Sequence, residues 1–274
     1  MELGLTESEK NEIVQATQEM LLEPFGWQVR SNFRIIDLKE SHYEEVIHML
    51  KHHFLTTEPM CKASSLLSEP DSVKCYLDMI RVWMKDTTSI IAVSTSTGRV
   101  IGVAITKIIS YLDKTDTYTR IQIYRGNALQ KVMQLQSALV KQARAFEQLN
   151  SESHLRIKIL CVHPTYQDRG LSRNLIEICL RVAESLKIPA VAGIFSSGSS
   201  QLLALSMGFR KLAEILYGRW VIHDEVIFDD PGTGNYSAAF MGIRVEIPDG
   251  GTIDEKSKSQ KEFDWARQYK RSNK

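Results

Sequence analysis

Short apolar runs alternate along the chain with longer segments of helical periodicity. The apolar runs are rich in β-branched residues, which fit the pleated surface of a sheet. We expect strands at residues 33–36, 89–95, 100–108, 155–162, 189–195, near 210–217 and near 236–246. The polar residues 96–99 (STGR) between two of these runs predict a hairpin.

Other segments place apolar side chains three or four positions apart, the spacing of one helix face. They are residues 41–54, 68–85, 127–149, 170–186 and 199–206. Ser41 is expected to cap the first segment, and Ser199 or Ser200 the last. The second segment begins with Ser-Glu-Pro-Asp, a cap followed by proline in the first turn. The pattern as a whole predicts an α/β chain of interleaved strands and helices.

The composition narrows the class of protein. The 274 residues are 43% hydrophobic and 24% charged, which is ordinary for a globular protein, and the net charge of +1 gives no signal for a nucleic-acid partner. No apolar run reaches the roughly 18 residues of a membrane span, and the polar N-terminus lacks the core of a signal peptide. The cysteines are widely spaced with no CxxC pair, as expected of reduced thiols. We therefore expect a cytoplasmic protein with no membrane or nucleic-acid partner.

The stretch 162–176 (VHPTYQDRGLSRNLI) leads from a strand into a helix. A helix start exposes unpaired backbone N–H groups and the positive end of the dipole, which together form an anion site. Gly170 permits close approach to the backbone, Ser172 adds a hydroxyl, and Arg169 and Arg173 add positive charge. The pattern differs from GxxxxGK[ST], so this is not a nucleoside-triphosphate-binding loop of that type. The alternative is a simple turn glycine with solvated arginines.

Three groups of residues carry a resemblance to a known family. Gln167-x-x-Gly170-x-Ser172 resembles the Q/R-x-x-G-x-G/A loop of the GNAT superfamily of N-acetyltransferases, with serine in the last small-residue place. Residues 54–60 (FLTTEPM) are similar to the FxxxEP segment of insect arylalkylamine N-acetyltransferases. The serine cluster 195–200 (FSSGSS), followed by 207–209 (MGF), resembles the same group. The resemblance covers roughly residues 33–247.

The resemblance implies a fold, a domain organisation and a donor. The fold would be a mixed, mostly antiparallel central sheet flanked by helices. Residues 1–32 would be an N-terminal extension, 33–247 the acetyltransferase domain, and 248–274 a polar tail in which Phe263 and Trp265 are the large apolar residues. Acetyl-CoA would be bound at its pyrophosphate by Gln167, Asp168, Arg169, Gly170, Leu171, Ser172 and Arg173, and along its pantetheine arm by Leu160, Cys161 and Val162.

Acetyl transfer requires a neutral amine, whereas an alkylamine at pH 7 favours its protonated form by roughly 4–5 kcal/mol. A carboxylate can accept that proton directly or through a water. The resemblance implies that Glu58, which precedes Pro59, is this general base. The alternative is an exposed loop carboxylate near the end of a helix.

The departing thiolate of CoA needs stabilisation or a proton. Ser196 and Ser200 lie four residues apart at a strand-to-helix junction, and the resemblance implies catalytic roles for serines there. The alternative interpretation is that these serines only cap the helix that follows. Cys161 is not expected to act as a nucleophile, because a strand cysteine is usually a small core residue. Several relatives carry a histidine where this chain has Phe240, which puts a histidine contribution from that strand in doubt.

The sequence does not favour a metal site, and it leaves two other functions open. His48 and His52 have the spacing of a ligand pair, but no HExxH motif accompanies them, so no metal is expected. The leading prediction is a monomeric arylalkylamine N-acetyltransferase that transfers acetyl directly in a ternary complex. One alternative is a polyamine or agmatine acetyltransferase, in which Glu69 or Asp71 would supply a second carboxylate. Another is a non-catalytic acyl-CoA-binding protein of the same fold.

Overall fold

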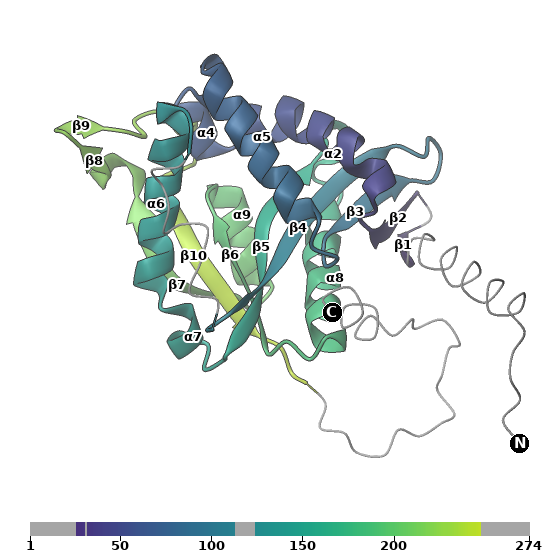
Figure 1. The fold of residues 1–274 in the computed structure, drawn as a ribbon. Helices are drawn as coiled ribbons and strands as arrows, with labels where there is room; N and C mark the ends of the chain where they lie inside the picture. Colours follow the sequence, from purple (N-terminus) through teal and green to yellow (C-terminus); the bar gives the residue numbers. More distant parts are fainter. Residues whose placement is uncertain (1–25, 31, 113–123, 248–274) are drawn as a thin grey trace, which may run out of the picture.

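An eight-stranded sheet forms the centre of the molecule (Figure 1). The structure is a computed structural model that describes residues 26–30, 32–112 and 124–247. The strand order is β1-β2-β3-β4-β5-β6-β10-β7, and neighbouring strands are antiparallel except β5 and β6. The mixed, mostly antiparallel sheet flanked by helices is therefore confirmed. Most of the expected N-terminal extension and the tail with Phe263 and Trp265 lie outside the described residues.

All the expected strands are present. They are β2 (Phe33–Asp37), β3 (Ile90–Ser94), β4 (Val100–Ser110), β5 (Ser153–Val162), β6 (Ala190–Phe195), β7 (Arg210–Leu216) and β10 (Ser237–Arg244). The sequence pattern missed β1 (Gly26–Arg30), which pairs with β2 and extends the sheet into the range expected as an extension. It also missed a separate two-stranded ribbon of β8 (Val221–Ile222) and β9 (Glu225–Val226).

The expected helices form, with breaks that periodicity did not reveal. The helical elements are η1 (Glu40–His42), α2 (Tyr43–Met49), the π-helical η2 (Leu50–Phe54), α3 (Leu55–Thr57), α4 (Pro59–Ala63), η3 (Leu66–Ser68), α5 (Pro70–Met84), α6 (Asn127–Ala143), α7 (Ala145–Gln148), η5 (Pro164–Tyr166), α8 (Leu171–Ser185), α9 (Gly198–Ser206) and η6 (Tyr217–Arg219). The expected helix 127–149 is interrupted at Arg144, whose φ is 40°. The cap assigned to Ser41 is wrong, because η1 precedes α2 and His42 occupies the N-cap position.

Helices cover both faces of the sheet (Figure 1). Side chains alternate between the faces along each strand. On β2, for example, Ile36 belongs to the core under α2, α5 and α6, whereas Ile35 belongs to the core under α8. Both side chains are buried. Because both faces of the sheet are covered, the sequences of the strands are continuously apolar and do not alternate between apolar and polar residues.

The parallel pair β5–β6 is bonded over only part of its length. Its register joins Leu155 to Val191, Arg156 to Ala192 and Ile157 to Gly193, and then ends. Strand β5 continues to Val162 along β4, and β6 continues to Phe195 along β10. The two strands therefore separate beyond Ile157, which leaves that edge of β5 without a neighbouring strand.

The register between β4 and β5 shifts where the two parallel strands separate. Ile105 pairs with Ile159 and Thr106 with Ile157, so Lys158 is an extra residue in β5. A bulge of this kind bends the strand and redirects the side chains that follow it. After the bulge Ile159 and Cys161 face the α6 side of the sheet, the side that Arg156 faces before it.

The start of α6 is held by side chains at the N-terminal end of α5 rather than by its own cap. Glu69 accepts hydrogen bonds from the backbone N–H groups of Asn127 (3.0 Å) and Ala128 (2.8 Å), and the Ser72 hydroxyl accepts one from Leu129 (2.9 Å). These are three of the amides that a helix start leaves unpaired. The hydroxyl of Ser72 and the two amides lower the pKa of Glu69. This contact joins two helices that are far apart in sequence.

We predict that Glu69→Ala lowers the free energy of unfolding by about 1 kcal/mol at pH 7, the typical effect of removing a helix cap. A carboxyl with a lowered pKa stabilises the fold above its ordinary pKa, and this contribution is lost as the pH falls and the group is protonated. The difference between the variant and the wild type should therefore shrink near pH 3. Urea unfolding at both pH values measures it, and an equal difference at the two would contradict the charged cap.

Candidate functional site

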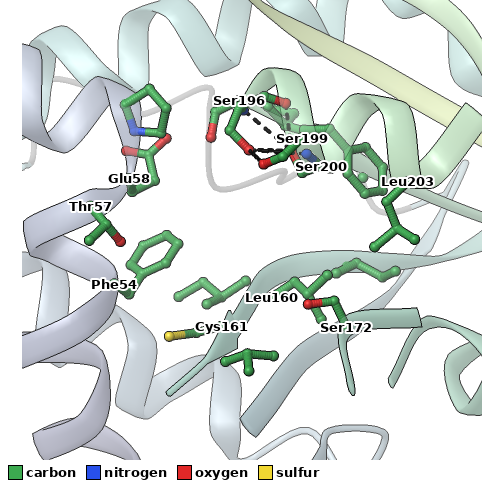
Figure 2. Close-up of a pocket in the computed structure, with 18 of the residues that line it drawn as sticks. Phe54, Thr57, Glu58, Leu160, Cys161, Ser172, Ser196, Ser199, Ser200 and Leu203 are labelled. Carbon is green, nitrogen blue, oxygen red and sulfur yellow. Dashed lines mark hydrogen bonds between the residues drawn. The ribbon is translucent and has the colours of Figure 1, made fainter. Parts of the chain in front are cut away.

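A cavity of about 660 Å³ lies where β5 and β6 separate. Figure 2 shows Phe54, Thr57 and Glu58 on one side of it and the serine cluster on the opposite side, with Leu160 and Cys161 on β5 between them. The start of α8 borders the same space through Gly170, Leu171, Ser172 and Arg173. The separated strands thus bring together segments that are more than a hundred positions apart in the chain.

The loop before α8 has the geometry of an anion site. Gly170 occupies the N-cap position with φ 78°, a left-handed conformation that glycine adopts without strain, and no side chain caps the helix. The amides of Leu171, Ser172 and Arg173 therefore have no intrahelical carbonyl to bond and lie at the positive end of the helix dipole. A phosphate group fits this end of the cavity.

Most of the expected loop residues line the cavity. They are Gln167, Asp168, Gly170, Leu171, Ser172 and Arg173, together with Leu160, Cys161 and Val162 of β5. Arg169 is the exception, since it does not line the cavity and lies over the ring of Tyr166 at 5.6 Å. The side chain of Arg173 donates a hydrogen bond of 2.7 Å to the Ser206 hydroxyl, which ties α8 to α9.

Glu58 is a buried carboxylate rather than an exposed loop residue. It is 8% exposed, and its φ and ψ of −64° and 124° show the non-helical backbone expected before a proline. It occupies the N-cap position of α4, where Oε2 accepts a 2.7 Å hydrogen bond from the N–H of Cys61. Among the described residues Oε1 has no hydrogen-bond partner. One oxygen thus fixes the carboxylate, while the other is buried and has no hydrogen-bond partner among the described residues.

The serines opposite Glu58 form a capping network. Ser197, not Ser199 or Ser200, occupies the N-cap position of α9, so that expectation is wrong. Ser200 completes a capping box: its amide donates to the Ser197 hydroxyl (3.2 Å), and its hydroxyl accepts from the Ser197 amide (3.3 Å). The hydroxyl of Ser196 lies outside this network, although Ser196 and Ser200 both line the cavity.

Tyr217 lies near the site and was not predicted from the sequence. Its hydroxyl donates a 2.6 Å hydrogen bond to the backbone carbonyl of Ser196, and its side chain is 1% exposed. Burial raises the pKa of Tyr217, and the nearby Glu58 and Cys61 raise it further. The phenol therefore stays protonated and positions the end of β6. No motif in the sequence marks this residue.

The sequence analysis also did not predict the basic residues of β5 near the site. His154 and Arg156 occupy alternate positions on one face of the strand, and Lys158 follows at the bulge. Arg156 and Lys158 line the cavity, whereas His154 lies beside the ring of Phe240, with ring centroids 6.4 Å apart. The signal available in the sequence was the alternation of basic residues within the otherwise apolar run 155–162.

Candidate metal ligands do not gather in the described residues, where no group of three or more His, Cys, Asp or Glu side chains could hold an ion. Rings of neighbouring histidines do approach one another: the His48 and His52 centroids are 4.3 Å apart, and those of His53 and His163 are 4.5 Å apart. Burial and the nearby His163, His52 and His48 lower the pKa of His53. Within the described ranges, no helix is long and apolar enough to cross a membrane.

Comparisons with known proteins support the fold. No family model matches the chain, and no curated protein matches it. The structure is similar to arylalkylamine N-acetyltransferase 7 of the yellow fever mosquito Aedes aegypti, with 21% identity, a TM-score of 0.73 and coverage of 81% of this chain and 96% of the other. It is also similar to arylalkylamine N-acetyltransferase 2 of Aedes aegypti (24% identity, TM-score 0.71, coverage 79% and 100%). A third similar structure is the Drosophila melanogaster polyamine N-acetyltransferase that forms N-acetylagmatine (15%, 0.68, 78% and 100%). The chain has the fold of these acetyltransferases.

We predict that Cys161 resists alkylation although it lines the cavity. Burial raises the pKa of its thiol to about 12, so the reactive thiolate is scarce from pH 6 to pH 9. The pKa of Cys179 is raised to about 12 in the same way, and Cys75 is the least buried of the four free cysteines. Iodoacetamide at pH 8, followed by peptide mass spectrometry, should modify Cys75 first. Faster modification of Cys161 would show an activated thiol.

Proposed function

We propose that the chain is an acetyl-CoA-dependent N-acetyltransferase that acts on a small primary amine of the arylalkylamine class. The observation that carries the proposal is that one cavity combines a helix N-terminus with three unpaired amides and a buried carboxylate with one unbonded oxygen. The fold shared with structurally characterised N-acetyltransferases supports it.

The start of α8 would hold the donor by its pyrophosphate. Acetyl-CoA supplies the acetyl group as a thioester. The amides of Leu171, Ser172 and Arg173 would bind the phosphates, while β5 beyond Ile157 would present its unpaired edge to the pantetheine arm. An N–H on that edge would polarise the thioester carbonyl. These residues would therefore hold the reacting carbon between the two walls of the cavity.

Glu58 would accept the proton of the amine through Oε1, directly or through a water. The neutral amine nitrogen then bonds to the acetyl carbon as the carbon–sulfur bond breaks. The thiolate takes a proton from a hydroxyl, and the second proton that the nitrogen loses returns to that hydroxyl oxygen. We assign that proton donation to the serine wall, where the Ser196 hydroxyl is outside the capping network and Ser200 is held by it. Direct transfer agrees with the raised pKa of Cys161, which disfavours an acetylated cysteine.

The alternatives receive less support from the same cavity. Glu69 and Asp71 do not line it, and Glu69 is engaged at the start of α6, so neither supplies the second carboxylate that a polyamine would need. A purely binding protein would have no use for a buried carboxylate with an unbonded oxygen in the acceptor half of the cavity.

Glu58→Gln tests the proposed base. The amide keeps an oxygen for the Cys61 N–H but cannot take a proton, so kcat/KM for an amine such as tyramine should fall about 10²–10⁴-fold at pH 7. The deficit should shrink as the pH approaches the pKa of the amine, because the free amine then reaches the site already neutral. Initial rates from pH 6 to pH 10 measure this.

The matched control for that measurement is Glu184→Gln, an exposed carboxylate in the last turn of α8, which should leave the rates unchanged. CoA affinity should be similar in all three proteins, since Glu58 faces the acceptor. A Glu58→Gln enzyme with nearly wild-type kcat/KM at pH 7 would exclude Glu58 as the base.

Gly170→Glu tests the donor end. A side chain at φ 78° is strained, and its carboxylate would stand where the phosphates bind, so calorimetry should detect no CoA binding. Gly218→Glu is the control, because Gly218 has open space around its Cα and lies outside the cavity. Unchanged CoA affinity in a folded Gly170→Glu protein would contradict the phosphate site.

A further inference from the structure

The loop of residues 229–235 contributes two residues to the cavity. It is part of the segment that joins β9 to β10, and its cavity-lining residues are Thr233 and Asn235. Neither belongs to the phosphate loop before α8, to the wall that contains Glu58 or to the serine cluster. The proposed mechanism therefore gives these two residues no role.

This loop contacts both walls of the acceptor half. Asp230 pairs with Lys62 of α4, the helix that Glu58 caps, at 3.7 Å. Asn235 Oδ1 accepts a 3.1 Å hydrogen bond from the N–H of Gly198, the first residue of α9. Figure 2 shows Glu58 and the serines that begin α9 on opposite sides of the cavity. The loop therefore extends from the wall of the proposed base to the serine wall.

Asn235 fixes the loop more firmly than the ion pair does. The side chains of Lys62 and Asp230 are 46% and 79% exposed, and exposed ion pairs contribute little to stability. Asn235 is partly buried, and both ends of its amide are bonded: Oδ1 accepts from Gly198, and Nδ2 donates a 3.0 Å hydrogen bond to the carbonyl of Pro231. One side chain thus joins the loop to itself and to α9.

The loop lies close to the start of α9, and the space beneath it is limited. A Cβ on Gly198 would lie 2.4 Å from the carbonyl oxygen of Gly234, so only glycine permits this approach. The cavity volume of about 660 Å³ is typical of a site for one drug-sized ligand. Under the proposed function it would hold the acceptor together with the thioester end of the donor. A loop fixed at this distance therefore favours a small acceptor.

We propose that residues 229–235 limit the size of the acceptor and that Asn235 is the positioning residue that holds them in place. This inference rests on the proposed function and adds a determinant of its specificity. An acceptor longer than the space between Glu58 and the loop must displace the loop from α9. That displacement breaks the hydrogen bond between Asn235 and Gly198, which lowers kcat/KM for the larger acceptor.

Two acceptors with the same aminoethyl group test this limit: phenethylamine and 2-(biphenyl-4-yl)ethylamine, which has one more ring. The wild type should show kcat/KM at least about tenfold higher for phenethylamine, since even one methylene group can change kcat/KM by about that factor. Asn235→Ala should reduce this ratio at least about fivefold, as expected for a lost hydrogen bond that held the loop. CoA affinity should be unchanged, because the donor binds at the start of α8.

Asn235→Asp is the matched conservative variant. Its carboxylate keeps an oxygen for the Gly198 N–H and is favoured at a helix N-terminus, so the ratio should stay within about twofold of the wild type. Asn127→Ala is a second control, because Asn127 is exposed and does not line the cavity, and it should leave the ratio unchanged. CoA affinity and thermal unfolding show whether each variant is folded.

Hydrogen exchange tests the role of Asn235 without turnover. In the CoA-bound protein, the peptide that contains residues 229–236 should exchange faster in Asn235→Ala than in the wild type, and Asn235→Asp should resemble the wild type. Unchanged exchange in Asn235→Ala would show that Asn235 does not hold the loop and would overturn the assignment.

Acceptor binding separates the size limit from the proposed activity. Calorimetry with CoA present should show the biphenyl amine binding at least about tenfold more weakly than phenethylamine to the wild type, with a smaller difference in Asn235→Ala. If this holds while no amine is acetylated, the proposed activity fails and the size limit stands. Equal or better use of the biphenyl amine by the wild type, or an unchanged ratio in a folded Asn235→Ala, would overturn the size limit while leaving the acetyltransferase activity in place.

Discussion

The early end of the β5–β6 ladder is the constraint on which the rest of the site depends. The last pair in its register is Ile157 with Gly193, where a Cβ on Gly193 would lie 3.0 Å from the Ile157 carbonyl. Glycine permits this close approach. Beyond this pair β5 stays bonded to β4, and β6 stays bonded to β10. A parallel pair bonded along its whole length would leave no room between the start of α8 and the wall that contains Glu58.

Side chains beyond the ladder hold the separated strand ends in place. Gln201 donates hydrogen bonds to the carbonyls of Phe195 (3.2 Å) and Ser237 (2.9 Å), which joins the end of β6 to β10. Tyr217 bonds the carbonyl of Ser196 one residue further on. These contacts supply partners for carbonyls at or beyond the strand ends, and buried carbonyls without partners are costly. The opening is therefore a stable feature of the fold.

The sequence predicted local features well and contacts between distant segments poorly. Periodicity located all the strands of the sheet except β1, and the loop around Gly170 identified the helix start that lines the cavity. The Glu-Pro pair predicted the backbone of Glu58, yet its burial depends on the packing of α4 and Tyr217, which no local pattern encodes. The N-cap of α9 was wrongly assigned to Ser199 or Ser200, because the preference for serine at an N-cap does not distinguish between adjacent serines. The backbone conformation at the end of β6 makes Ser197 the N-cap residue.

The bulge at Lys158 determines which side chains β5 presents to each face of the sheet. Because one extra residue is inserted there, Arg156 before it and Cys161 after it face the same side of the sheet despite their odd spacing. Without the bulge, Cys161 would point toward α8, and the face of β5 beside the cavity would change its side chains. The same insertion coincides with the separation from β6, so residues 159–162, which line the cavity, follow it directly. Glu58 comes from a separate wall, so the shape of the site depends both on the path of β5 after the bulge and on the start of α4, which holds Glu58 through the Cys61 N–H.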